Sequence, residues 1–366
     1  MLAQLFITGS LLGCAFAAPA ASDPAKRSTC TKPLQRKAWH TLTSDEKTSY
    51  LNAELCLMST PGTLGLRGGR TKYDEFQSVH VYQAGIAHFV GQFLPFHRLY
   101  VHAHEHALRT HCNYTGAQPY WDETVDAGAF STSQTLKDFG GDGSGDNECI
   151  SSASIFGTYL NPIGPGYRLR DHCIQRKVSN FASTAAAKDT VDGCLAKKTY
   201  LDLWNCVESG PHGAGHGGVG SGMTNPVSSP GDPIFYLHHT WLDKLWAVWQ
   251  SQDKEVRVKE IGGNNTPGFD FSSGPRNGGG FPGGGTGGGQ VPPGGGDDPG
   301  RFFGGPGFGT PADLVRPDDV PEPLVVGDNG NTTTLNQVLQ MYGIVPNQTI
   351  AEVMDIVGGV LCYEYL

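Results

Sequence analysis

Histidine is concentrated in two stretches of this 366-residue chain, with a spacing typical of metal ligands. The first stretch contributes His80, His88 and His97, and the second contributes His212, His216, His238 and His239. Neutral imidazole is a common ligand of transition metals, and several imidazoles without thiolates suit copper, zinc or iron. The sequence therefore predicts two sets of nitrogen ligands, joined by a scaffold that brings the two sets together.

His212 and His216 lie four residues apart, so on one helical turn both side chains face the same way and can bind one ion. Gly213, Gly215 and Gly217 stand among and beside them. Each glycine costs about 1 kcal/mol in a helix interior, so this helix needs outside support, which a metal ion would provide. A zinc-protease motif requires glutamate directly after the first histidine, where this chain has Gly213. That class of metalloenzyme is excluded.

Helices are predicted around both stretches. Thr43 and Glu46 form a capping-box pattern ahead of apolar residues at helical spacing, which predicts an amphipathic helix over 43–57. A second helical run begins near Tyr73 and leads into the first histidines. A third runs over 233–250 and carries an apolar stripe.

Two long segments lack helical periodicity. Residues 112–200 are mixed, with loops rich in glycine, serine and aspartate, and residues 262–309 contain 21 glycines. The glycine-rich segment cannot bury enough apolar surface to offset the cost of ordering the chain, so we expect it to be a long loop. We interpret residues 28–366 as a single domain that includes this loop.

The N-terminal residues have the pattern of a secretory signal peptide. An apolar run ends in Ala-Phe-Ala at 15–17, which predicts a signal peptide over 1–17. This run is too short for a membrane span, and no later stretch is long and apolar enough to be one. The dibasic pair Lys26-Arg27 predicts a propeptide over 18–27, the alternative being two ordinary surface charges. We therefore expect a secreted, extracellular protein.

Eight cysteines would remain after such cleavage, scattered without CxxC pairs. An even number in an oxidising compartment favours disulfide bonds over zinc, although the sequence alone leaves the pairing open. Sequons at Asn113, Asn264, Asn331 and Asn347 predict glycosylation of some of these asparagines. The net charge is −9, and the sequence has no basic stripe of the kind that binds a phosphate backbone. Nucleic acid is therefore not expected as a partner.

Longer motifs around both stretches resemble those of a known family. Residues 93–98, Phe-Leu-Pro-Phe-His-Arg, with His88 nine positions before His97 and His80 eight before His88, resemble the first copper motif of type-3 copper proteins. Residues 232–239, Asp-Pro-Ile-Phe-Tyr-Leu-His-His, resemble the second. Further family landmarks are matched by Asp243, Trp246, Pro-Tyr-Trp-Asp at 119–122 and Tyr-Glu-Tyr at 363–365. The chain is similar to secreted fungal tyrosinases and catechol oxidases.

The resemblance implies which histidines bind metal. His80, His88 and His97 would bind one copper ion, and His212, His216 and His239 the second, while His238 would lie behind these ligands. The six other histidines are interpreted as structural or solvent-facing, and these are His40, His102, His104, His106, His111 and His172. Three of them, at 102, 104 and 106, point about 200° apart in succession on a helix, so they cannot converge on one ion.

The same resemblance implies a fold and a chemistry. The fold would be mainly α, a four-helix bundle that holds a dicopper centre and is joined by long loops and disulfides. The substrates would be dioxygen and phenolic small molecules, and the products o-quinones. Neutral ligands leave the charge of two copper ions uncompensated, which favours binding of phenolate or catecholate. A haemocyanin-like oxygen-binding protein is the alternative from another class.

Glu208 and Gly213 bear on the choice among the family's activities. By the resemblance, Glu208, four residues before His212, would hold a water that helps to deprotonate phenols. The alternative is an exposed carboxylate at a helix end. Many tyrosinases carry asparagine where Gly213 stands, so we expect oxidation of o-diphenols with weak or no hydroxylation of monophenols. A full tyrosinase and an o-aminophenol oxidase are the alternatives.

The chain also departs from the family's pattern. Ile86 stands two positions before His88, where fungal tyrosinases often have a cysteine, so a thioether crosslink from that position cannot form. Because the chain stops one residue after Tyr365, we expect no C-terminal lid that needs proteolysis. We expect residues 217–227 to border an open entrance and Phe235 to belong to the core.

Overall fold

The computed structural model describes residues 30–267, 269–270, 274–275, 325–328 and 330–366. The predicted signal peptide and propeptide, and most of the glycine-rich segment 262–309, lie outside these residues. The described part of the chain is mainly helical, and its strands are short and paired two by two. The predicted mainly α class is thereby confirmed.

Three long helices form the first half of the bundle. They are α1 (Ser44–Ser59), α2 (Lys72–Ala87) and α3 (Phe93–His111). Thr43 and Glu46 exchange hydrogen bonds at the start of α1, so the predicted capping box is confirmed. Thr71 and Asp74 form the same box on α2. Because the box fixes where α2 begins, it also fixes which face of that helix carries His80.

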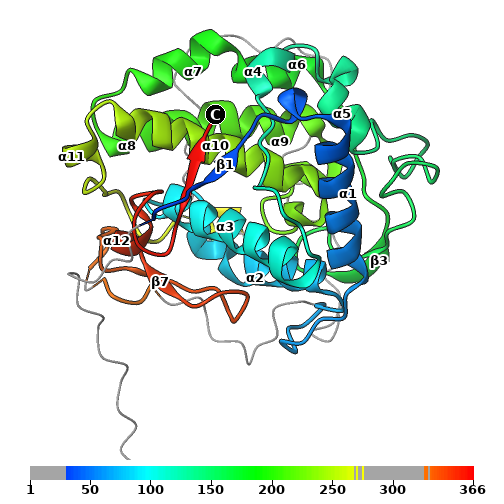
Figure 1. The fold of residues 1–366 in the computed structure, drawn as a ribbon, viewed down its shortest axis with the longest axis horizontal. Helices are drawn as coiled ribbons and strands as arrows, with labels where there is room; N and C mark the ends of the chain where they lie inside the picture. The colour runs from blue at the N-terminus through cyan, green and yellow to red at the C-terminus, as the bar shows by residue number, and fades with distance from the viewer. Residues whose placement is uncertain (1–29, 268, 271–273, 276–324, 329) are drawn as a thin grey trace, which may run out of the picture.

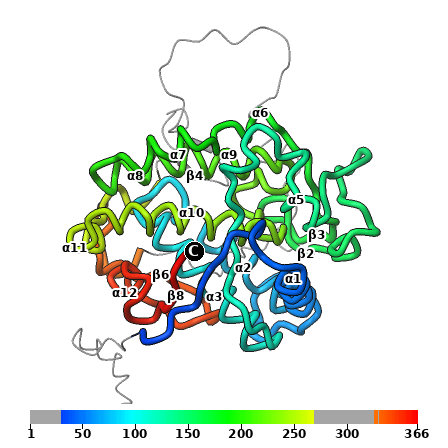
Figure 2. Tube along the Cα trace, turned by 45° about the horizontal axis from the view of Figure 1, so that its top comes forward, coloured from blue at the N-terminus to red at the C-terminus, as the bar shows by residue number. Residues whose placement is uncertain are grey.

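The second half begins with a continuous helical segment. It consists of α8 (Tyr200–Val207), a π-helical turn (Glu208–His212) and α9 (Gly213–Val219), and it is followed by α10 (Ile234–Ser251). The helix predicted over 233–250 is therefore confirmed as α10. Figure 2 shows α10 lying between the α2 and α3 pair and the α8–α9 segment, and α10 packs against α3. This is the helical bundle that the sequence predicted.

Short elements complete the described fold. The remaining helices are η1 (Trp39–Thr41), α4 (Glu123–Asp126), η2 (Phe130–Thr132), α5 (Gln134–Asp138), α6 (Asn180–Ser183), η3 (Thr184–Ala186), α7 (Lys188–Leu195), η5 (Ser221–Thr224), η6 (Ser229–Gly231), α11 (Lys254–Arg257) and α12 (Ile350–Val353). The strands are β1 (Leu34–Arg36), β2 (Asn161–Ile163), β3 (Leu169–His172), β4 (Phe269–Asp270), β5 (Gly274–Pro275), β6 (Val338–Leu339), β7 (Gln348–Thr349) and β8 (Tyr363–Tyr365). They pair as β1 with β8, β2 with β3, β4 with β5 and β6 with β7.

The two ends of the described chain meet on one side of the bundle. β1 and β8 are parallel, with Leu34 opposite Tyr363, and the disulfide Cys30–Cys362 lies next to this pair. Figure 1 shows the blue and red strands side by side across the helices. The C-terminal landmark motif at 363–365 is therefore a strand that pairs with the first strand of the described chain.

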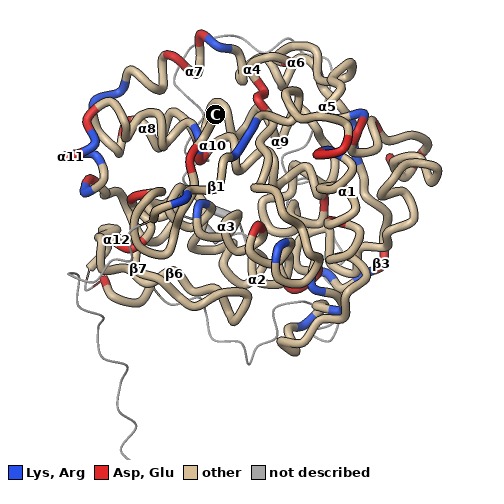
Figure 3. Tube along the Cα trace, in the orientation of Figure 1, with Lys and Arg blue, Asp and Glu red and all other residues tan. Residues whose placement is uncertain are grey.

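A buried ionic cluster fastens these strands to the helices. The carboxylate of Asp243 on α10 accepts hydrogen bonds from Arg98 Nε at 2.5 Å and from the Tyr363 hydroxyl at 2.6 Å. Arg36 on β1 donates to Glu105 on α3 at 2.7 Å. All five side chains are buried. Elsewhere acidic and basic residues are interspersed along the described trace (Figure 3).

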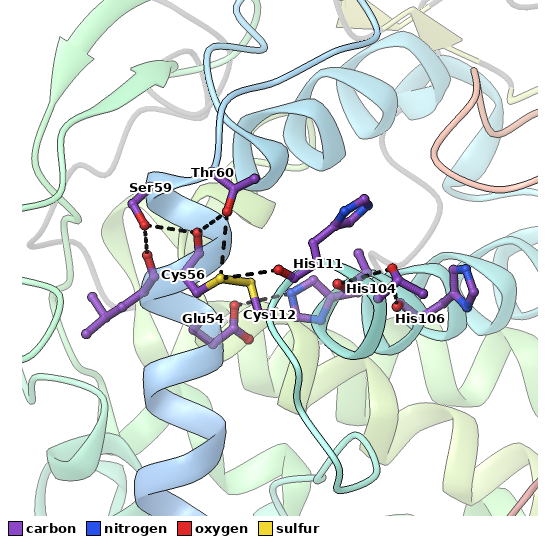
Figure 4. The surroundings of a disulfide bond; sticks show 11 residues. Glu54, Cys56, Ser59, Thr60, His104, His106, His111 and Cys112 are labelled. Atoms are coloured by element: carbon purple, nitrogen blue, oxygen red, sulfur yellow. Dashed lines mark hydrogen bonds and ion pairs between the residues drawn. A yellow bond between two sulfur atoms is a disulfide. The ribbon is translucent and has the colours of Figure 1, made fainter.

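Four disulfide bonds use all eight cysteines of the described chain, so the prediction of disulfides over zinc is confirmed. The pairs are Cys30–Cys362, Cys56–Cys112, Cys149–Cys173 and Cys194–Cys206. The second pair ties α1 to the end of α3 (Figure 4). None of the helices in the described ranges combines the length and the apolar character that a membrane crossing requires.

Candidate metal centre

The three histidines of the first stretch come together in the structure. His80 lies on α2, His88 directly follows α2 as its C-terminal cap, and His97 lies one turn into α3. One ring nitrogen from each lies within 4.8 Å of the others, and all three side chains are buried. The fold therefore brings the three histidines that the sequence predicts as nitrogen donors into one cluster.

The second stretch forms a second cluster. His212 ends the π-helical turn, His216 lies on α9, and His238 and His239 lie on α10. Ring nitrogens of all four lie within 4.8 Å of one another. His212 and His216 are partly exposed, whereas the first cluster is fully buried. The outer face of α9 is therefore the side on which the centre lies nearest to solvent.

The two clusters are in contact. The rings of His97 and His239 stack with centroids 4.2 Å apart, and the His88 and His212 centroids lie 6.3 Å apart. Phe235 packs between the clusters and is fully buried. Its ring centroid lies 4.1 Å from that of His239 and 5.3 Å from that of His80. Phe235 is thus a core residue, as expected, but the core at this point consists largely of histidine rings.

Backbone carbonyls fix the orientation of five of these rings. In the first cluster, the Nδ1 atom of His80 lies 2.9 Å from the carbonyl oxygen of Val227, that of His88 lies 3.3 Å from Ala84 O, and that of His97 lies 2.9 Å from Phe93 O. In the second cluster, the Nδ1 atom of His212 lies 3.1 Å from the carbonyl oxygen of Glu208, and that of His216 lies 2.5 Å from Met223 O. A carbonyl oxygen only accepts, so each Nδ1 carries the hydrogen and each Nε2 keeps its lone pair. Within the described residues, Nε2 of His80, His97 and His212 is buried without a hydrogen-bond partner. Such inward lone pairs fit a metal ion.

The environment keeps the imidazoles neutral. Burial, together with the neighbouring histidines, lowers the pKa of His80, His97, His212 and His239 well below the ordinary value. Burial also lowers the pKa of His88 to about 4 and that of His216 to about 3. A neutral imidazole is the form that binds a metal, so at neutral pH the donors need not lose a proton first.

Glu208 is buried within the bundle, which excludes the alternative of an exposed carboxylate at a helix end. Its Oε1 accepts from the Phe89 backbone N–H at 2.7 Å, and its Oε2 accepts from Trp204 Nε1 at 2.5 Å. Burial raises the pKa of Glu208 to about 8, despite these two donors. Its backbone carbonyl accepts from the Nδ1 of His212, so Glu208 also orients a ring of the second cluster.

Gly213 lies on the exposed side of α9, directly after His212. The nearest atom to a Cβ built at this position is the Glu208 carbonyl oxygen, 4.0 Å away. A larger side chain would therefore have room here, next to the second cluster.

The segment 217–227 has a role that the sequence analysis missed. Met223 and Val227 belong to this segment, which is expected to border an open entrance, yet both are buried. Their carbonyl oxygens accept from the Nδ1 atoms of His216 and His80. The segment thus supports one histidine from each cluster. Only the fold could reveal this, because every residue type offers the same carbonyl group.

The other six histidines lie outside the two clusters, as predicted. His104 is buried and contacts Glu54 at 3.2 Å and Gln118 at 3.0 Å, and Figure 4 shows its ring turned toward Glu54 while His106 points away. His172 lies within 3.0 Å of two carbonyl oxygens. His40, His106 and His111 are exposed and His102 is partly buried. Residues 102, 104 and 106 do not converge on one point, as their spacing along the helix predicts.

The fold and the two touching clusters define a helical protein with a paired histidine centre. The sequence profile described as the common central domain of tyrosinase matches residues 70–252, the range that holds both clusters. The chain belongs to the tyrosinase family of type-3 copper proteins.

Two related sequences and one solved structure specify the relationship. Over 252 residues the chain is 34% identical to tyrosinase ustQ of Aspergillus flavus, covering 64% of this chain and 69% of that protein. It is 33% identical over 268 residues to the tyrosinase-like protein phomQ1 of Diaporthe leptostromiformis, covering 66% and 67%. The structure of a polyphenol oxidase variant from Thermothelomyces thermophila superposes with a TM-score of 0.66 at 25% identity, covering 91% of this chain and 89% of that one.

Proposed function

We propose that the protein is a secreted dicopper polyphenol oxidase that oxidises o-diphenols to o-quinones with dioxygen. His80, His88 and His97 would hold one copper ion and His212, His216 and His239 the other. The observation that carries this proposal is the pair of touching clusters, whose oriented rings turn Nε2 lone pairs inward. Bound copper would supply the redox chemistry with dioxygen.

The protein's own residues would orient the substrate and handle its proton. All six proposed ligands are neutral, so a metal-loaded centre would carry uncompensated positive charge and attract phenolate or catecholate. Glu208 lies one turn from His212, and burial raises its pKa to about 8; the positive charge of bound copper would favour its carboxylate form, which could hold a water and accept a phenol proton. The partly exposed His212 and His216 indicate that phenols approach along α9.

Gly213 supports a preference for catechols over monophenols. A side-chain amide at this position would lie beside His212 and could orient the water that Glu208 holds, and glycine supplies none. A full tyrosinase and an o-aminophenol oxidase use the same copper chemistry and are the alternatives within the family. A haemocyanin-like oxygen-binding protein is the less favoured alternative.

Oxygen consumption by purified, copper-loaded protein tests the proposal directly. Turnover of 4-tert-butylcatechol without turnover of tyramine would support catechol oxidation. Turnover of both would make the protein a tyrosinase, and turnover of 2-aminophenol in preference to the catechol would favour the o-aminophenol oxidase. A reversible oxygen-dependent absorption band with no substrate consumed would indicate oxygen binding alone.

Secretion and glycosylation are also part of the proposal. Four disulfides require an oxidising compartment to form, and the asparagines of all four sequons are exposed. A signal peptide over 1–17 and a propeptide over 18–27 would leave a catalytic domain over 28–366. Expression in a secreting host, followed by N-terminal sequencing and glycosidase treatment of the medium fraction, tests each of these points.

A further inference from the structure

Four imidazoles converge in the second cluster, although three would complete the proposed copper site. The ring of His238 has its centroid 4.8 Å from that of His216 and 4.9 Å from that of His239. Its Nε2 is buried and has no hydrogen-bond partner among the described residues. One ring nitrogen of His238 lies within 4.8 Å of one ring nitrogen each of His212, His216 and His239. His238 is therefore placed as an inward-facing donor.

Glu123 holds the other side of this ring. Its Oε1 lies 2.6 Å from His238 Nδ1, and both side chains are fully buried. A carboxylate against the outer nitrogen of a histidine is the arrangement that orients metal-binding imidazoles and makes them better donors. Among the described members of the two clusters, His238 is the one whose Nδ1 contacts a carboxylate.

Gly215 makes room for this pair. A Cβ built at Gly215 would lie less than 3.0 Å from His238 Nδ1 and 2.8 Å from Glu123 Oε1, so any other residue would displace the pair. At Gly217, on the same helix, a Cβ would meet only Ala182 Cβ at 3.4 Å, an ordinary contact. A glycine between His212 and His216 weakens α9, and the space it leaves is filled by His238 and Glu123.

We propose that His238, oriented by Glu123, is a fourth nitrogen donor of the second cluster and binds the metal ion as it enters the apo protein. The inference rests on the proposed function, because it requires that this cluster bind copper. A metal closed by four protein ligands is typical of a structural site, whereas a catalytic metal keeps a position open. His238 therefore serves capture of the ion and gives up its place when dioxygen or a phenol binds.

Copper binding by the full, metal-stripped chain tests this role without any measurement of turnover. The protein is titrated with Cu⁺ in the absence of dioxygen, in competition with a colorimetric Cu⁺ chelator. The unmodified chain is expected to bind two ions. In His238→Phe, the affinity for one of the two ions is expected to fall about 10–100-fold. In Glu123→Gln, the affinity for the same ion is expected to fall by a smaller factor. The affinity for the other ion stays unchanged in both variants.

His104→Phe is the matched control, because His104 is also a buried histidine paired with a glutamate, Glu54, but lies outside both clusters. It should leave both affinities unchanged. Should His238→Phe fail to fold, Gly215→Ala provides a second test, since it displaces the His238 ring and keeps the imidazole. Gly217→Ala is its control on the same helix.

The outcomes separate the two proposals. Two ions bound with unchanged affinities in His238→Phe or in Gly215→Ala would overturn the role of His238 and leave the dicopper proposal intact. An equal loss of affinity in His104→Phe would also overturn it, because any buried histidine–glutamate pair would then have the same effect. An unmodified chain that binds no copper at the second cluster would overturn the proposed function itself.

Discussion

The imidazole rings of His97 and His239 stack with centroids 4.2 Å apart and an interplanar angle of 15°. His97 belongs to the first cluster and lies on α3, and His239 belongs to the second and lies on α10. Because α10 packs against α3, the helix interface sets the separation of the two clusters. The six proposed ligands would therefore hold a pair of copper ions at this interface.

Replacing His97 by alanine is expected to reduce the copper content from two ions per chain to one. The first cluster would keep two donors, while the second cluster would keep all of its own. Copper per chain, measured by elemental analysis of the purified protein, checks this. His106→Ala, an exposed position on the same helix, should keep two ions. Two ions bound in His97→Ala would contradict the proposed ligand set.

Introducing asparagine at Gly213 is expected to raise monophenol turnover. The position is exposed and a Cβ has open space, so the fold should tolerate the change. If the amide orients a water held by Glu208, the ratio of tyramine to 4-tert-butylcatechol turnover should rise by about 10²-fold, the lower end of what a positioned general base contributes.

Gly213→Ala is the matched control, because it adds a side chain without an amide, and it should leave the ratio unchanged. Adding Glu208→Gln to Gly213→Asn should remove the gain. An equal rise in the alanine variant would show that space, and not the amide, limits monophenol turnover.

The sequence could predict those parts of the centre that depend on local pattern. Thr43 and Glu46 define the start of α1, and the spacing of His212 and His216 places both on one face of the helical segment formed by the π-helical turn and α9. Such features need only neighbours along the chain, whose geometry the helix itself imposes. The choice of three histidines for each copper ion rests on the resemblance to a family.

The parts that could not be predicted depend on contacts between distant segments. Glu123 lies 115 positions before His238, and nothing in the local sequence of either residue indicates that they meet. The carbonyl groups of Met223 and Val227 orient two of the rings, but a carbonyl carries no sequence signal. The disulfide pairing was open for the same reason, since it follows from which loops the fold brings together.

Acid stability is expected to depend on Asp243. Burial alone would raise the pKa of this carboxyl, but Arg98 and Arg36 and the hydroxyl of Tyr363 outweigh burial and leave the pKa below its ordinary value. A group whose folded pKa lies below its unfolded value stabilises the protein above the unfolded pKa, about 4, and loses that effect as the pH falls through the folded pKa. The wild-type protein should therefore lose stability steeply below pH of about 4.

Asp243→Asn should lower the free energy of unfolding at pH 7 by about 3–5 kcal/mol, because it leaves buried arginines without their partner. Its stability should then fall less steeply in acid than that of the wild type. Urea unfolding at a series of pH values checks both points. Glu46→Gln, which removes a partly exposed pair with Lys37, should change the neutral stability far less. Parallel pH profiles for wild type and Asp243→Asn would contradict the prediction.

The disulfide between Cys30 and Cys362 is expected to stabilise the chain more than the disulfide between Cys149 and Cys173. The two bonds span sequence separations of 332 and 24 residues. In the chain-entropy account, a crosslink restricts the unfolded chain more when it closes a longer loop. The stabilising free energies of two crosslinks then differ by three halves of RT times the logarithm of the ratio of their loop lengths. For these two bonds that difference is about 2 kcal/mol.

Paired serine substitutions, Cys30→Ser with Cys362→Ser and Cys149→Ser with Cys173→Ser, allow the comparison by urea unfolding of the metal-free protein. The variant open at the chain ends should be the less stable by about 2 kcal/mol, even though β1 and β8 still pair and the Asp243 cluster still holds both strands. An equal decrease in the free energy of unfolding in the two variants would contradict the prediction. It would mean that these strands and the cluster already restrict the ends of the unfolded chain, so that the crosslink adds little further restriction.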